Sequence, residues 1–168
     1  MLIQSYGLFW DRDGVEWSPG SGTRRHLWGR RNKYRPALRV GDAWGQHGLY
    51  VLYSYTGPYY VGIARRQTLG KRLADHTRDD LYDWRRFSWF GFLPMSDEPG
   101  EISQPDHDAE SMKAPTRDEL IADMEALLIK SMGTFNINNL NFRDATEWDQ
   151  IFARDAHKWI ERIESDGF

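Results

Sequence analysis

The chain has 168 residues, 40% of them hydrophobic and 28% charged, with a formal net charge of −3; these values predict one globular domain and exclude a disordered chain. The absence of cysteine excludes disulfides and thiolate metal sites, and it fits a reducing, cytoplasmic setting. No stretch is apolar for long enough to span a membrane, and we expect no secretory signal.

The charge is unevenly distributed along the chain. Residues 1–47 hold eight Lys/Arg against four acids, whereas the remainder holds 14 against 21. We therefore treat 1–47 as a basic N-terminal extension packed on a domain formed by 48–168, the two making a single compact unit. A basic segment on an acidic body is typical of a phosphate-binding surface, but a solvated loop with scattered arginines has the same composition.

The first 47 residues predict little regular structure beyond their start. Residues 2–9 are apolar and aromatic and predict a strand. The turn Asp13-Gly14, followed by 15–17, predicts that this strand forms a β-hairpin. Residues 18–47 show no clear period and predict irregular structure.

The middle of the chain predicts the core of the fold. Two β-branched and aromatic runs, about 49–55 and 59–63, predict a second hairpin. Residues 69–84 then predict a helix and 86–93 a third strand. The polar, acidic and proline-bearing stretch 94–116 predicts a long surface loop.

Two helices are predicted in the last third. Thr116 and Glu119 have capping-box spacing, which predicts a helix that Gly133 ends. Its apolar residues are expected to face the core: Leu120, Met124, Leu127, Leu128 and Met132. A last helix over about 145–165 follows from helically spaced apolar side chains. The whole pattern predicts an α/β (α+β) fold with a small, largely antiparallel central sheet flanked by helices, an N-terminal β-hairpin and a C-terminal helix.

Two short strings lie on the strands of the second hairpin, Gly48-Leu49-Tyr50 and Tyr60-Val61-Gly62. Three further elements follow in order: Arg72 with His76, Glu125 in the string EALLIK, and Asn136 in the string FNI. Over about 48–142, with 94–116 as an insertion, this set resembles the GIY-YIG nuclease family.

The resemblance implies an endonuclease, a hydrolase that cuts phosphodiester bonds in DNA with one Mg²⁺ or Mn²⁺ ion held by Glu125. The sequence departs from the family pattern in two places. Leu49 and Val61 replace isoleucine, which keeps the strands apolar. The proline usual before the asparagine is missing and the spacing to Asn136 is one residue shorter, so Asn138 is the alternative.

The residue types suit phosphodiester hydrolysis, which needs a base for the attacking water and cations for the phosphoryl oxygens. Tyr50 is expected to act as the base, with its pKa lowered by Arg72, Lys71 and the metal, or with His76 taking its proton. Tyr60 is expected to orient water or phosphate. The alternative for both tyrosines is strand packing.

For each remaining site residue, a structural role is the alternative to the catalytic one. Arg72 is expected to grip the scissile phosphate, or else to form a surface ion pair with Asp75 or Asp79. Glu125 lies beside the apolar stripe of its helix, where a carboxylate at the core edge favours a cation; the alternative is a solvent-facing acid. Asn136 is expected to tether the site or to cap a turn.

DNA is the expected partner. The residues expected to bind its phosphates are Arg24, Arg25, Arg30, Arg31, Lys33, Arg35 and Lys71. Two other functions stay open: a nucleic-acid-binding module that does not cut, and a sequence-specific restriction or defence nuclease. The sequence leaves the oligomeric state open, with a homodimer as one option.

Overall fold

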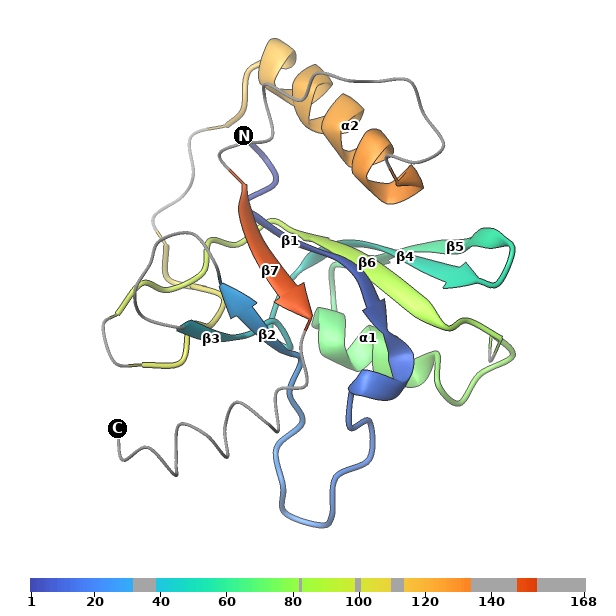
Figure 1. Ribbon diagram of the computed structural model, residues 1–168. Helices are drawn as coiled ribbons and strands as arrows, with labels where there is room; N and C mark the ends of the chain where they lie inside the picture. The colour runs from blue at the N-terminus through green and yellow to red at the C-terminus, as the bar shows by residue number, and fades with distance from the viewer. Residues whose placement is uncertain (32–38, 82, 99–100, 110–113, 134–147, 154–168) are drawn as a thin grey trace.

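The computed structural model describes residues 1–31, 39–81, 83–98, 101–109, 114–133 and 148–153 (Figure 1). Over these ranges the chain is an α+β protein with one mixed sheet of seven strands. The strands are β1 (Ser5–Asp11), β2 (Trp28–Arg31), β3 (Arg39–Asp42), β4 (Gly48–Ser54), β5 (Gly57–Ala64), β6 (Arg86–Gly91) and β7 (Asp149–Ala153). The helices are α1 (Leu69–Asp75), α2 (Arg117–Met132) and a short 3-10 turn, η1 (Arg12–Gly14).

The strand order is β3-β2-β7-β1-β6-β4-β5. β1 pairs with β7 in parallel, and this pairing makes the sheet mixed. The other pairings among the described strands are antiparallel, including the predicted hairpin of β4 and β5 and the pairing of β4 with β6. The sheet is therefore wider than the small one that the sequence predicts.

The predicted N-terminal hairpin is wrong. β1 lies between β7 and β6, and residues 15–17 form no strand. β1 carries buried rings toward both faces of the sheet, with Tyr6 in one core cluster and Trp10 in the other. Such a strand suits the middle of a sheet, where both faces are covered. Trp17 packs edge-on against Trp84 at 5.8 Å instead of pairing with β1.

The predicted C-terminal helix is also wrong where the structure describes it. Residues 149–153 form β7, which fills the gap between β1 and β2. Ile151 is fully buried there, whereas Phe152 is exposed. Pairing with strands on both sides outweighs the helical spacing of the apolar residues, because strand preference depends on neighbours more than on local pattern. β2 and β3 likewise lie within the stretch predicted to be irregular.

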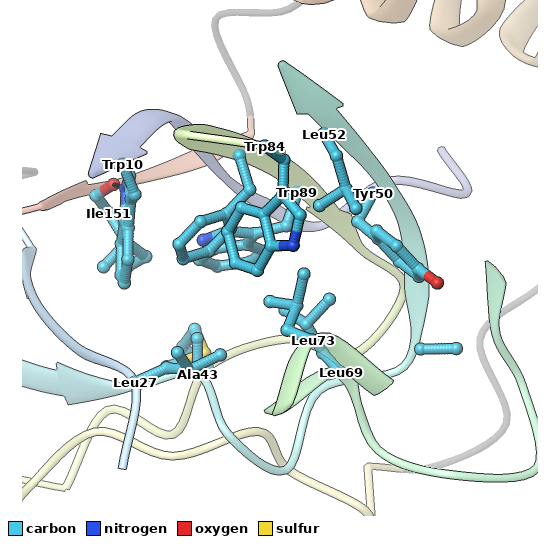
Figure 2. Packing of buried hydrophobic residues seen from close by; sticks show 13 residues of the cluster. Trp10, Leu27, Ala43, Tyr50, Leu52, Leu69, Leu73, Trp84, Trp89 and Ile151 are labelled. Atoms are coloured by element: carbon cyan, nitrogen blue, oxygen red, sulfur yellow. Dashed lines mark hydrogen bonds between the residues drawn. The ribbon is translucent and has the colours of Figure 1, made fainter. Parts of the chain in front are cut away.

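The sheet separates two cores. One contains α1 residues Leu69 and Leu73, together with a row of buried side chains that runs from Trp10 to Tyr50 (Figure 2). The other contains the α2 residue Ala126 and lies on the opposite face, because alternate strand residues such as Tyr50 and Leu49 belong to different clusters. Figure 1 shows the same arrangement, with α1 and α2 on opposite sides of the sheet.

α2 begins and ends as predicted, but the side of the helix that faces the core differs from the predicted side. The capping box of Thr116 and Glu119 is present, and Gly133 is its C-cap. The buried residues are Asp123, Ala126, Ile129 and Ser131, so the predicted inward face is wrong except at Leu127, which is half-buried against the core. These predicted core residues are exposed: Leu120, Met124, Leu128 and Met132. Neither described α-helix is long and apolar enough to cross a bilayer.

A buried carboxylate explains the orientation of α2. Asp123 accepts the backbone N–H of Leu2 at 2.6 Å and the indole N–H of Trp148 at 3.2 Å. A buried carboxylate needs such donors, so these contacts turn Asp123 toward the sheet. Ala126 follows on the same side and packs in the cluster that contains Tyr6 and Phe90.

Candidate active site

The β4–β5 hairpin and α1 bring four of the predicted site residues together. Gly62 pairs with Tyr50 across the hairpin, and Tyr60 lies two residues before Gly62, so both phenol rings project from the same face. α1 packs against that face and carries Arg72 and His76. The ring centroids of Tyr50 and Tyr60 are 5.6 and 5.1 Å from that of His76.

The two glycines of the motif strings have steric roles. A Cβ at Gly62 would overlap the phenol ring of Tyr50, so this glycine lets the ring lie flat across β5. A Cβ at Gly48 would overlap the carbonyl oxygen of Phe90 on β6. Each string therefore pairs a tyrosine with a glycine that admits a close neighbour.

A chain of short hydrogen bonds runs through the site. The Tyr50 hydroxyl is 2.6 Å from Nε2 of His76, and Nδ1 of His76 is 2.5 Å from Oδ2 of Asp79. An ionised carboxylate only accepts hydrogen bonds, so Nδ1 carries the proton and donates it to Asp79. With Nδ1 as the donor, a neutral ring would leave Nε2 to accept the hydrogen bond from Tyr50.

Burial keeps Tyr50 protonated. It raises the pKa of Tyr50 to about 12; the Arg72 guanidinium opposes this rise and Tyr60 adds to it. The expectation that Arg72 lowers the pKa of this phenol is right in direction, but burial outweighs it. Tyr50 and His76 are buried, whereas Tyr60 and Arg72 are half-buried and form the solvent side of the cluster.

Asp79 is the third residue in this series of hydrogen bonds. The sequence analysis considers it only as an ion-pair partner of Arg72. The signal that finds it is the spacing of a histidine and an aspartate three residues apart at a helix end. α1 ends at Asp75, earlier than predicted, and His76 is its C-cap. The turn that follows brings Asp79 back to the imidazole.

Glu125 does not join this cluster. It is exposed on α2, which packs on the opposite face of the sheet from Tyr50, so its expected place at the core edge is wrong. Its carboxylate is a suitable donor for a hydrated Mg²⁺ ion. However, an ion bound by Glu125 would lie on the opposite face of the sheet from Tyr50. Within the described ranges, no three His, Cys, Asp or Glu side chains form a group that could hold a metal.

Other predicted site residues lie outside the described residues. They are Asn136, its alternative Asn138, and the basic residues Lys33 and Arg35. Their proposed roles therefore stay predictions.

The predicted DNA-binding residues that the structure describes fall into two groups. Arg31 is nearly buried, with Nε 2.5 Å from Asp149 and Nη1 2.9 Å from Asp97, so it joins β2 to β7 and to the acidic loop. Its guanidinium therefore links these segments of the fold, and its predicted contact with a phosphate stays a prediction. Arg24, Arg25 and Lys71 are exposed, and Arg30 is half-buried.

Ser18 lies in the same loop as Arg24 and Arg25, and it contacts the turn that follows α1. Arg78 donates a hydrogen bond to Ser18 at 3.3 Å, which links the two. His26 stacks on Trp28 with ring centroids 4.1 Å apart, and it pairs with Asp42 at 2.7 Å. These contacts hold His26 beside β2 and β3, and the two arginines before it are exposed to solvent.

Comparisons with protein-family models, with curated proteins and with solved structures gave no match for this chain. The GIY-YIG resemblance thus depends on the motif residues alone.

Proposed function

We propose that this protein is a nuclease that hydrolyses phosphodiester bonds in DNA. The observation that carries the proposal is the hydrogen bond from Tyr50 to His76, with Arg72 and Tyr60 on its solvent side. A base coupled to a phenol, next to a guanidinium that suits a phosphate, is what attack on a phosphodiester requires. The spacing of the motif residues supports the same reaction through the family resemblance.

The proton path follows from the direction of the hydrogen bonds. As the water oxygen bonds to phosphorus, Tyr50 gives its proton to Nε2 of His76 and regains one from the water through the hydroxyl of Tyr60. The bond from phosphorus to the leaving sugar oxygen breaks, and that oxygen takes a proton from solvent. Arg72 balances the charge that develops on the phosphoryl oxygens.

The resemblance also implies a magnesium ion at Glu125, which would polarise the phosphate and lower the pKa of a bound water. Because α2 lies on the other face of the sheet, the steps above use only the side chains of the cluster. The requirement for Mg²⁺ or Mn²⁺ stays part of the proposal and is tested separately.

The test is a cleavage assay on plasmid, single-stranded and branched DNA with Mg²⁺, Mn²⁺ or EDTA. We expect Tyr50→Phe and Arg72→Ala each to slow cleavage by about 10² or more, the range for loss of a base or of a charge donor. Tyr55→Phe is the control, since Tyr55 is 81% exposed. Wild-type rates in Tyr50→Phe would show that Tyr50 only packs the strand.

One observation favours a second function, a nucleic-acid-binding module that does not cut. Tyr50 is fully buried and Glu125 lies on the opposite face, so the two predicted catalytic groups are apart. Such a module would bind DNA in a salt-dependent way. It would leave every substrate intact in the assay above with either metal.

A further inference from the structure

We propose that Asp79 is a positioning residue: it fixes the orientation and tautomer of His76 so that Nε2 faces Tyr50 as a proton acceptor. The catalytic consequence of this inference rests on the proposed nuclease function. The geometric part, the tautomer of His76, does not.

The two carboxylate oxygens of Asp79 have separate partners. Oδ1 accepts the backbone N–H of Leu81 at 2.9 Å, and Oδ2 faces Nδ1 of His76 at 2.5 Å. The first contact holds the carboxylate in the turn after α1, so that the second oxygen is aimed at the imidazole. A turn-capping aspartate alone would need only the first contact.

Other contacts hold His76 as well. The backbone carbonyl of His76 accepts the indole N–H of Trp84 at 3.0 Å, and the rings of Tyr50 and Tyr60 lie beside the imidazole from β4 and β5. Arg72 lies one turn earlier on α1. Among the described residues around the ring, Asp79 is the acidic group that contacts it.

Ionisation of Asp79 agrees with this geometry. Burial would raise its pKa, but the Leu81 N–H, His76 and Arg72 lower it below its usual value. The carboxylate is therefore charged at neutral pH. It stabilises the imidazolium that forms when His76 takes the proton of Tyr50, as a carboxylate does beside a catalytic histidine.

The side chain of Asp79 is 41% exposed whereas that of His76 is 4% exposed. Substitution of Asp79 therefore leaves a small void at most, and the helix keeps its packing. This difference makes a functional effect separable from a loss of folding.

The experiment compares Asp79→Asn and Asp79→Ala with Asp75→Asn and Asp80→Asn, two exposed aspartates close to His76. Imidazole ¹⁵N shifts of His76 are recorded in each full-length protein without DNA. Single-turnover cleavage and DNA affinity are measured in parallel. Thermal melting reports on folding, and Asp79→Glu tests whether a carboxylate at this position restores the wild-type behaviour.

We expect the wild-type protein to show Nδ1 protonated and Nε2 free, and both Asp79 variants to lose this preference. The cleavage rate should fall by about 10- to 100-fold with DNA affinity unchanged, the range for removing a group that orients a histidine. The Asp75 and Asp80 variants should match the wild type, and Asp79→Glu should recover part of the rate.

Unchanged ¹⁵N shifts in folded Asp79→Asn would overturn the inference, and so would changed shifts with a wild-type rate. If the wild type cuts no DNA, the nuclease proposal fails, while the ¹⁵N spectra still decide whether Asp79 sets the tautomer of His76.

Discussion

The phenol ring of Tyr50 lies directly over the α-carbon of Gly62 on the neighbouring strand, in space that any side chain at position 62 would fill. The glycine of the second motif string thus fixes where the tyrosine of the first can lie. A packing constraint and a functional group are combined in this one cross-strand pair.

Gly62→Ala should displace Tyr50 and break its hydrogen bond to His76. We expect a loss of about 1–3 kcal/mol in the free energy of unfolding, the usual cost of overpacking, and a large fall in cleavage. Denaturant unfolding and single-turnover cleavage measure the two effects. Gly57→Ala is a poor control because of its positive φ of 131°, so Gly14→Ala, where a Cβ meets no neighbour, is used. A fully active Gly62→Ala would contradict the close packing.

Arg31 and the pair Arg24/Arg25 should behave in opposite ways. Arg31→Ala removes the guanidinium that pairs with the buried carboxylate of Asp149, which should cost about 3–5 kcal/mol of stability. The double substitution of Arg24 and Arg25 by alanine should keep the melting temperature. It should flatten the slope of log affinity against log salt by up to about two units, at roughly 0.9 per lost phosphate contact.

Melting curves and binding at several salt concentrations distinguish these outcomes. An unchanged salt slope in the Arg24/Arg25 variant would remove this segment from DNA binding. A wild-type melting temperature for Arg31→Ala would mean that its ion pairs contribute little.

Glu125→Ala tests the metal that the resemblance implies. The family pattern predicts loss of metal-dependent cleavage with folding and DNA binding intact, and the exposed position of Glu125 makes a stability effect small. Asp118→Asn, at an exposed acid on the same helix, is the control for charge. Full cleavage by Glu125→Ala would show that the reaction proceeds from the Tyr50 side of the sheet without this carboxylate.

Alkaline pH should destabilise the fold through its buried phenols. Burial is the largest cause that raises the pKa of Tyr6, Tyr50 and Tyr53, each to about 12, against about 10 for a free phenol. Between these pH values the folded state binds more protons than the unfolded state, so stability is present below pH 10 and falls as the pH rises toward 12.

Absorbance at 295 nm should accordingly show phenols that ionise only near pH 12, and Tyr50→Phe should remove one of them. Melting temperatures measured across the same window should fall with increasing pH. Ionisation of every tyrosine near pH 10 without loss of the folded state would contradict the burial of these rings.

Local signals in the sequence were sufficient for the parts of the fold that depend on neighbours in the chain. The β4–β5 hairpin follows from two apolar runs around Gly57-Pro58, and the α2 start follows from the Thr116 capping box. Both are confirmed because each is decided by contacts within a few residues.

The features that could not be predicted from the sequence are those that depend on contacts between distant segments. β7 is a strand because β1 and β2 lie on either side of it. α2 turns Asp123 inward because Leu2, about 120 residues earlier, supplies a donor. The candidate site shows the same division: the motif strings predicted the meeting of Tyr50, Tyr60, Arg72 and His76, but not the face on which Glu125 lies.

The place of β7 between β1 and β2 also sets the order in which the molecule can assemble. Until residues 149–153 have left the ribosome, none of the other described strands joins β2 and β3 to β1, and facing strand edges stay open. Folding must then close loops of more than 100 residues, which is slow and exposes unpaired edges to other chains. A nascent chain halted before residue 149 would hold the β4–β5 hairpin and α1 but could not complete the sheet.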